Sequence, residues 1–539
     1  GERGTLRILD VDRDAVLDDA IPHVRHPSVS WLPDGSAFAY SRLPDPEAVG
    51  EGEDGYWESV WWHQTGTDAG SDTPVLAHDL ERTALPGTTI SPDGRWLVVH
   101  IHLMPTRTDV ILIERETQDE TVVVEGQEAS TSLQVVGDRL YGVTNLGAPR
   151  GRVVSAATSA PQAEDWQTLV PESSAVIEGI AIAGDSLLVA STEHALSRLQ
   201  RYNLDGSGGE DIALPGMGSI GVIDAHPDHA RAFLTFSSFD RPTGILRWTP
   251  DGLEPWRQGA NTELPALVTE QVFYESTDGA RVPMFVVRSP ATTPAPETPT
   301  VLSGYGGFAI TSSPAFSPAV VTWCEAGGVY ALAGIRGGAE YGEQWHRAGM
   351  LDNKSQVFDD FCAAGDWLVG QGRTSRERLG IRGGSNGGLL VGATITRRPD
   401  LCRAAVCAVP LIDMLRYQHF LIGALWVPEY GDPDDPGEFE TLLSYSPYHR
   451  VIDGTRYPAV LITTAEADAR VDPMHALKFA ARLQAATSAP EENPVLLRLE
   501  SRAGHGSGKP AWKQAEEHAD TWSFLAWQLG LSDPGARPV

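Results

Sequence analysis

The sequence is short of cysteine, of lysine and of long apolar runs, and each shortage excludes a class of protein. Only four of its 539 residues are cysteine. None of them stands in a C-x-x-C or other zinc-ligand spacing, so we predict neither a disulfide framework nor a metal site. The chain has no apolar run of about 18 residues or more, the length that a membrane-spanning helix needs. We therefore expect that the chain does not span a membrane.

Positive charge is also scarce. The chain has 41 lysine and arginine residues against 72 aspartate and glutamate residues, which gives a formal net charge of −31, and only four of the basic residues are lysine. A surface of this charge repels phosphate groups, so we exclude nucleic-acid binding. We interpret the acidic charge as a means of keeping the protein soluble, with attraction of cationic peptides as the alternative.

One short segment predicts a chemistry. The residues Gly383–Gly388 form a G-x-S-x-G pattern around Ser385, after an apolar strand predicted at Leu379–Ile381 and before a helix predicted to begin at Leu389. This order of strand, turn and helix is the context of a nucleophile elbow. The glycines permit a turn so tight that the serine hydroxyl stands clear of its neighbours. Ser385 is therefore a candidate nucleophile.

A serine hydroxyl needs a base to take its proton, and the base needs an acid to hold its tautomer. In α/β-hydrolases these groups follow in the order Ser, Asp or Glu, His. A buried parallel strand is predicted at Ala459–Thr463, and the next strand, Val495–Leu499, is followed by His505 between two glycines. We predict His505 as the base. Three carboxylates follow the first of these strands, and spacing alone does not choose among them: Glu466, Asp468 and Asp472.

The N-terminal half of the chain has a different pattern, in which short alternating strands are separated by turns. The aspartates of five such turns stand 59, 45, 47 and 43 residues apart, which is the spacing of β-propeller blades. We predict a propeller with about five visible blades over residues 1–264 and a catalytic domain over residues 265–539. A non-repeating array of β-sandwiches is the alternative. The five aspartates are Asp34, Asp93, Asp138, Asp185 and Asp228.

Five motifs, in the correct order, resemble those of the prolyl oligopeptidase family. They are Gly304–Phe308, Ile335–Gly342, Gly383–Leu390, Asp468–Val471 and Ala503–Gly506. The resemblance covers the whole C-terminal half and, more loosely, the N-terminal half. It implies an α/β-hydrolase catalytic domain with a doubly wound, mostly parallel sheet, together with an all-β propeller domain.

The resemblance also implies roles for individual residues. It makes Asp468 the acid of the triad, lets Arg470 reach toward the bound peptide, and has Tyr305 donate its phenolic O–H to the oxyanion. The hydrolase pattern takes another oxyanion donor from the backbone N–H of Asn386, the residue after the nucleophile. By the same resemblance Trp426 stacks on a proline ring of the substrate. The other walls of that pocket are then Tyr430, Phe308 and Val471.

The sequence thus predicts a serine endopeptidase that cleaves short oligopeptides on the C-terminal side of proline through an acyl-enzyme on Ser385. We expect a monomer without a cofactor, whose propeller restricts access to small, proline-containing peptides. An enzyme like oligopeptidase B or acylaminoacyl-peptidase, or a peptide macrocyclase, is the alternative. Glu429 and Asp432 keep a preference for basic residues open, because they lie close to Trp426 in the sequence. Outside the enzymes, the alternative is a propeller scaffold with a silent hydrolase domain.

The sequence departs from the family at its start. The resemblance implies a seven-bladed propeller preceded by a segment that packs on the hydrolase domain, whereas we count five blades, and Gly1 is not an initiator methionine. We therefore expect that the printed chain lacks an N-terminal part of the natural protein, with a smaller propeller as the alternative. Because no apolar signal core follows Gly1, we predict a cytoplasmic location.

Overall fold

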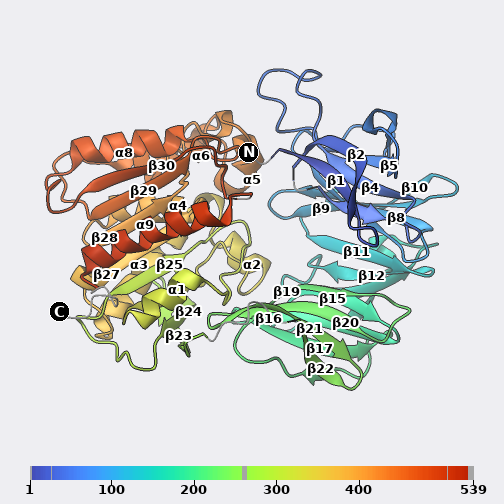
Figure 1. Cartoon of the computed structure of the whole chain (residues 1–539), viewed down its shortest axis with the longest axis horizontal. Helices are drawn as coiled ribbons and strands as arrows, with labels where there is room; N and C mark the ends of the chain where they lie inside the picture. Colours follow the sequence, from blue (N-terminus) through green and yellow to red (C-terminus); the bar gives the residue numbers. More distant parts are fainter. Residues whose placement is uncertain (1–2, 26, 258–263, 507, 532–539) are drawn as a thin grey trace. The chain divides into compact units, whose positions relative to one another are not determined.

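The computed structural model of this protein describes residues 3–25, 27–257, 264–506 and 508–531. Small sheets make up the N-terminal part of the chain, and one large sheet flanked by helices makes up the C-terminal part (Figure 1). Of the helices within those ranges, none is both long enough and apolar enough to cross a bilayer.

The described N-terminal part consists of a hairpin and five four-stranded sheets, and in each sheet neighbouring strands are also neighbours in the chain. Each predicted turn aspartate lies between the first and second strand of one sheet, so the period of the turns reports the repeat of the sheets. The hairpin is β1 (Gly4–Asp10) and β2 (Ala15–Val24), and the sheets run from β3 (Val29–Trp31) to β6 (Thr73–Pro74), β7 (Leu85–Ile90) to β10 (Asp119–Val124), β11 (Thr131–Val136) to β14 (Gln167–Val170), β15 (Val176–Ala183) to β18 (Glu210–Ile212) and β19 (Ser219–Ala225) to β22 (Gly252–Arg257).

The sheet β7–β10 packs against the sheet β11–β14, which follows it in the chain. Val98 of β8 (Trp96–Leu103) shares one buried apolar cluster with Leu133 of β11 and Val154 of β13 (Arg152–Ala157). A buried polar contact joins the same two sheets, because the backbone N–H of Leu133 donates to Nε2 of His100 at 2.9 Å. Packing of successive four-stranded sheets on one another is the arrangement of propeller blades.

The large sheet has eight strands in the order β23-β24-β26-β25-β27-β28-β29-β30. The six strands from β26 to β30 are parallel, while β24 is antiparallel to both β23 and β26. This confirms the predicted mostly parallel sheet. Their bounds are β23 (Val268–Glu275), β24 (Arg281–Arg288), β25 (Thr300–Gly304), β26 (Val329–Ala333), β27 (Leu379–Gly384), β28 (Ala404–Ala408), β29 (Ala459–Ala465) and β30 (Val495–Glu500).

Helices cover both faces of this sheet. Successive side chains of a strand point to opposite faces, and β25 shows the result. Leu302 packs in the core that contains α3 (Lys354–Gly370), α4 (Asn386–Arg397) and α8 (Met474–Ala486), and Val301 packs in the core that contains α1 (Pro318–Glu325) and α9 (Ala511–Leu529). The sheet is therefore doubly wound, as predicted. The shorter α-helices are α2 (Glu343–Arg347), α5 (Val427–Tyr430), α6 (Pro436–Tyr445) and α7 (Pro447–Arg450).

The described chain divides into two compact units. The first consists of residues 1–191, 199–211 and 224–232, and the second of residues 192–198, 212–223 and 233–539. The first unit holds β1 to β14 and the second holds the large sheet with its helices, while residues of β15 to β22 are divided between the units. The domain boundary between residues 264 and 265 stays a prediction. Thr262, where the sequence pattern begins to change, lies outside the described residues.

Candidate active site

The serine elbow has the strained backbone that its pattern predicts. Ser385 follows the last residue of β27 and precedes α4, with φ 58° and ψ −120°. This is the left-handed region, which non-glycine residues rarely adopt. A Cβ on Gly383 would lie 2.2 Å from the carbonyl oxygen of Gly387, so the turn requires glycine there. The helix begins at Asn386, three residues earlier than the prediction of Leu389, because Ser385 itself serves as its N-cap.

A buried carboxylate orients the predicted base. His505 Nδ1 lies 2.7 Å from Oδ2 of Asp468, whose side chain is fully buried. Oδ1 of the same carboxylate accepts from the backbone N–H groups of Arg470, at 2.9 Å, and Val471, at 3.0 Å. These contacts hold the imidazole through Nδ1, so Nε2 is the nitrogen that can accept a proton from a hydroxyl group.

The other two carboxylates have different surroundings. Oδ1 of Asp472 accepts from the backbone N–H of Met474 at 2.8 Å, at the start of α8. Glu466 is exposed. Of the three acids that spacing left open, the structure thus places Asp468 against His505.

Tyr305 lies beside the serine elbow. Burial raises the pKa of the Tyr305 phenol. A hydrogen bond with the Ser385 side chain lowers it by a smaller amount, so the pKa stays above its ordinary value. The loop that carries Tyr305 is joined to the elbow, because Nδ2 of Asn386 donates to the Tyr305 carbonyl at 2.6 Å. Asn386 is also the first residue of α4, where backbone N–H groups have no partner within the helix. A phenolic donor and a helix N-terminus therefore both lie next to Ser385.

Two of the residues predicted to form the pocket, Phe308 and Tyr430, are in direct contact. The rings of Phe308 and Tyr430 meet edge to face, 5.5 Å apart. Phe308 and Trp426 are partly buried and pack against the apolar core that includes Tyr430 and Val471. The Tyr430 hydroxyl donates to Oδ1 of Asn386 at 2.9 Å, which connects this wall to the elbow.

Glu429 has a role that the sequence did not indicate. Its side chain is buried, with Oε2 2.7 Å from His346 Nε2 and Oε1 3.1 Å from Lys354 Nζ. Oε1 also accepts from the backbone N–H of Phe308 at 3.1 Å. Burial raises the pKa of this carboxyl, but the charges of Lys354 and His346 outweigh burial and lower it. The carboxylate is therefore ionised and fully engaged within the chain. Neither Lys354 nor His346 stands in a local pattern that marked it beforehand.

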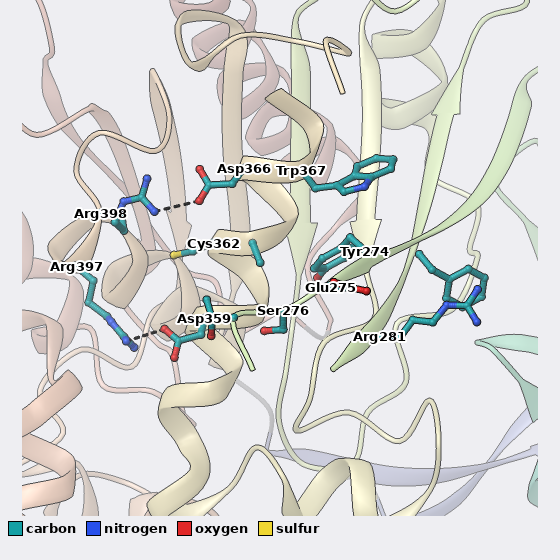
Figure 2. Close-up of a pocket in the computed structure, with 13 residues that line it drawn as sticks. Tyr274, Glu275, Ser276, Arg281, Asp359, Cys362, Asp366, Trp367, Arg397 and Arg398 are labelled. Carbon is teal, nitrogen blue, oxygen red and sulfur yellow. Dashed lines mark hydrogen bonds and ion pairs between the residues drawn. The ribbon is translucent and has the colours of Figure 1, made fainter. Parts of the chain in front are cut away.

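A hollow of about 830 Å³ lies elsewhere, between the edge strand β23, its neighbour β24 and helix α3 (Figure 2). Four of its charged residues form ion pairs, Asp359 with Arg397 at 2.8 Å and Asp366 with Arg398 at 3.2 Å. None of the candidate site residues lines it. Within the described ranges, no three His, Cys, Asp or Glu side chains gather as metal ligands.

Comparison with known proteins agrees with both halves of the fold. The profile of the Prolyl oligopeptidase family matches residues 314–532, and that of the Prolyl oligopeptidase N-terminal beta-propeller domain matches residues 1–255. The chain is 35% identical over 532 residues to the prolyl endopeptidase of Elizabethkingia meningoseptica, which covers 97% of this chain and 75% of that relative. It is 31% identical over 539 residues to the dual function macrocyclase-peptidase POPB of Amanita bisporigera, which covers 96% of this chain and 73% of that relative.

Solved structures show the same likeness. A structure from a study of two prolyl endopeptidases superposes with a TM-score of 0.93 at 38% identity and covers 99% of this chain and 79% of its own. Prolyl oligopeptidase B from Galerina marginata, bound to a 25mer macrocyclization substrate, superposes with a TM-score of 0.91 at 29% identity and covers 99% of this chain and 78% of its own. The chain therefore belongs to the prolyl oligopeptidase family of serine peptidases, with a propeller domain and a hydrolase domain.

Proposed function

We propose that this peptidase cleaves short peptides after proline, with Ser385 as nucleophile, His505 as base and Asp468 as the acid that orients it. Two observations support the proposal: the contact between His505 Nδ1 and Asp468 Oδ2, and the strained backbone that the serine elbow adopts at Ser385. An imidazole oriented in this way accepts a proton at Nε2 and keeps its own proton at Nδ1.

In the proposed reaction, His505 Nε2 takes the proton of Ser385 while the serine oxygen bonds to the peptide carbonyl carbon. The carbonyl oxygen becomes an oxyanion, which the Tyr305 hydroxyl and the Asn386 backbone N–H stabilise as donors already in place. The imidazolium then gives its proton to the leaving amine, and an ester on Ser385 remains. Water attacks this ester by the same route and regenerates the serine.

The preference for proline is supported by the chemistry of the pocket residues. Phe308 and Trp426 are aromatic and only partly buried, and a proline ring is rigid and has no N–H to satisfy. Recognition of arginine or lysine instead requires a free carboxylate. Glu429 is not free, because Lys354, His346 and the Phe308 N–H occupy its oxygens.

The deciding experiment compares kcat/KM for matched chromogenic peptides that carry Pro, Ala, Arg or Phe before the scissile bond. We expect the proline peptide to be cleaved fastest, with a Ser385→Ala variant as the inactive control. A preference for arginine of about tenfold or more would overturn the proline specificity and leave the triad in place.

Transpeptidation is the second candidate, favoured by the likeness to relatives whose names include macrocyclase activity. An acyl-enzyme can be resolved by the amine of the same peptide instead of by water. Incubation of a longer peptide with an internal proline separates the two outcomes by mass spectrometry, since a cyclic product is lighter than the hydrolysed one by one water.

We also propose that folded proteins are poor substrates and that the propeller limits access to short peptides. Rapid digestion of a folded protein under conditions in which short proline peptides are cleaved would contradict this. The monomeric state and the cytoplasmic location stay predictions.

A further inference from the structure

The loop Gly304–Phe308 and helix α5 are joined by a buried ion cluster, which we define as Glu429, Lys354 and His346. All three side chains are at most 1% exposed. Glu429 lies on α5, Lys354 at the start of α3 and His346 on α2, so three helices contribute. The cluster includes no residue to which the proposed reaction assigns a role.

Two members of the cluster bind the backbone of the loop. Lys354 Nζ donates to the Gly306 carbonyl at 3.0 Å, and Glu429 Oε1 accepts from the Phe308 N–H at 3.1 Å. The loop therefore receives one donor and one acceptor from the same ion pair. Between these two anchor points the chain cannot shift relative to α5 without breaking a charge-assisted hydrogen bond.

The loop needs such support because its backbone is strained. Phe308 and Ala309 have φ values of 57° and 54°, two consecutive non-glycine residues in the left-handed region. Conformations of this kind persist only where the surrounding structure imposes them. Close packing adds a further constraint, since a Cβ on Gly306 would lie 2.4 Å from a side-chain carbon of Val357.

The loop also carries the two groups on which the proposed function depends. Tyr305 forms a hydrogen bond with the Ser385 side chain. Phe308 packs against Tyr430, which follows Glu429 in the chain. Any displacement of the loop therefore moves the oxyanion donor and the pocket wall together.

We propose that Glu429, Lys354 and His346 act as positioning residues that set the loop Gly304–Phe308 against α5, and so fix the Tyr305 donor and the Phe308–Tyr430 wall in one geometry. The proposal rests on the roles proposed above for Tyr305 and the pocket. It goes beyond them, because it assigns a purpose to a carboxylate that the proposed reaction does not use.

The first test removes the charge of Glu429 and keeps its shape. Glu429→Gln retains an oxygen for the Phe308 N–H and leaves Lys354 buried without a counter-charge, which is strongly unfavourable. We expect kcat for the proline peptide to fall about 30- to 100-fold, because small misplacements of catalytic groups have effects of this order. The ratio of kcat/KM for proline over alanine peptides should fall as well. A folded Glu429→Gln enzyme with both values unchanged would overturn the proposal.

The second test uses His346, at the other end of the cluster. In His346→Gln the side-chain amide can donate to Glu429 Oε2 in place of Nε2, whereas His346→Leu removes the donor. We expect the glutamine variant to keep kcat within about threefold of the wild type and the leucine variant to lose about tenfold or more. Equal losses, or none, in the two variants would contradict a positioning role even if Glu429→Gln failed to fold.

A double variant tests the coupling within the cluster. Lys354→Met alone leaves Glu429 short of a partner, but Glu429→Gln combined with Lys354→Met leaves no unpaired charge between the two. We expect the double variant to lose less activity than the product of the two single losses, since contacting residues are not additive. Simple multiplication of the two losses would argue against the cluster acting as a unit.

The matched control is Asp19→Asn in the other compact unit. Asp19 is a buried carboxylate whose Oδ1 lies 3.0 Å from Nε2 of the buried His63, so the substitution removes the same kind of charge. We expect a lower melting temperature and an unchanged kcat, which separates positioning from general stability.

A chemical probe separates failure of this proposal from failure of the proposed function. The rate at which a small fluorophosphonate inactivates the enzyme depends on Ser385 and its oxyanion donors and not on the residue before the scissile bond. If the wild type shows no preference for proline but Glu429→Gln slows inactivation about tenfold or more, the specificity is wrong and the positioning role stands. An unchanged inactivation rate in a folded Glu429→Gln enzyme would reject the positioning role.

Discussion

His505 Nδ1 faces Oδ2 of Asp468 at 2.7 Å, while both backbone N–H groups that bind this carboxylate, from Arg470 and Val471, converge on its other oxygen. The two carboxylate oxygens of Asp468 therefore make different contacts. One is held by the loop, and the other is presented to the ring. A side chain with a single oxygen cannot perform both.

Asp468→Asn should therefore nearly abolish activity without removing the fold. The amide oxygen is claimed by the two backbone donors, so the amide N–H₂ faces His505 Nδ1 and drives the ring proton to Nε2, where it blocks acceptance of the serine proton. We expect kcat to fall on the order of 10,000-fold, as for this change in other triads. The measurement is kcat with a chromogenic proline peptide. Asp472→Asn, which can still accept from Met474, is the control and should stay within about threefold.

Tyr305→Phe tests the phenolic donor. Loss of one oxyanion donor costs on the order of 100- to 1,000-fold in rate, and the substitution removes only an oxygen that hydrogen-bonds the Ser385 side chain. We expect kcat to fall by this factor while KM changes little, because the donor acts on charge that develops after binding. A fall of less than about tenfold would count against the role.

Gly383→Ala should destabilise the elbow. The added methyl group would lie 2.2 Å from the Gly387 carbonyl oxygen, which belongs to α4 and has little freedom to move. We expect a loss of unfolding free energy of about 2 kcal/mol or more, as for other overpacked sites. Gly384→Ala is the matched control, because its methyl group would meet nothing closer than 3.6 Å. Equal melting temperatures for the two variants would refute the steric argument.

The stability of the second unit should depend on pH through His346. Burial opposes the charge of this ring, but the carboxylates of Glu343, 3.6 Å from Nδ1, and Glu429, 2.7 Å from Nε2, outweigh burial and raise its pKa to about 8, from 6.5 for an ordinary histidine. The folded state thus holds the proton more tightly than the unfolded chain. The resulting stabilisation is complete below about pH 6.5 and is lost as the pH rises through about 8, with an upper limit of about 2 kcal/mol.

This pH dependence is measured by denaturant unfolding of the wild type and of His346→Gln at pH 6 and pH 9. The difference between the two proteins isolates the histidine from other titrating groups. We expect the wild type to lose more stability than the variant over this interval. Parallel losses in the two proteins would show that His346 does not carry the effect.

Local patterns sufficed to predict much of this fold. The apolar run at Ala459–Thr463 lies within β29, and the turn at Asp138 joins the first two strands of its sheet, because strand and turn signals act over a few residues. The pairing of Glu429 with His346 and Lys354 could not be predicted in this way. These residues lie 83 and 75 positions apart in the chain, and only the packing of three helices brings them together. The sequence left Glu429 open as a recognition group for basic residues, whereas the structure engages it internally.

The side chain of Asn386 has a consequence for which substitutions the elbow can tolerate. One end of its amide donates to the Tyr305 carbonyl, and the other accepts from the Tyr430 hydroxyl. Aspartate at position 386 would place a carboxylate oxygen against the Tyr305 carbonyl oxygen, so two acceptors would face each other. Leucine would make neither hydrogen bond. The position beside the nucleophile is therefore restricted to an uncharged group with a donor and an acceptor at opposite ends, although the chemistry proposed for it uses only the main chain.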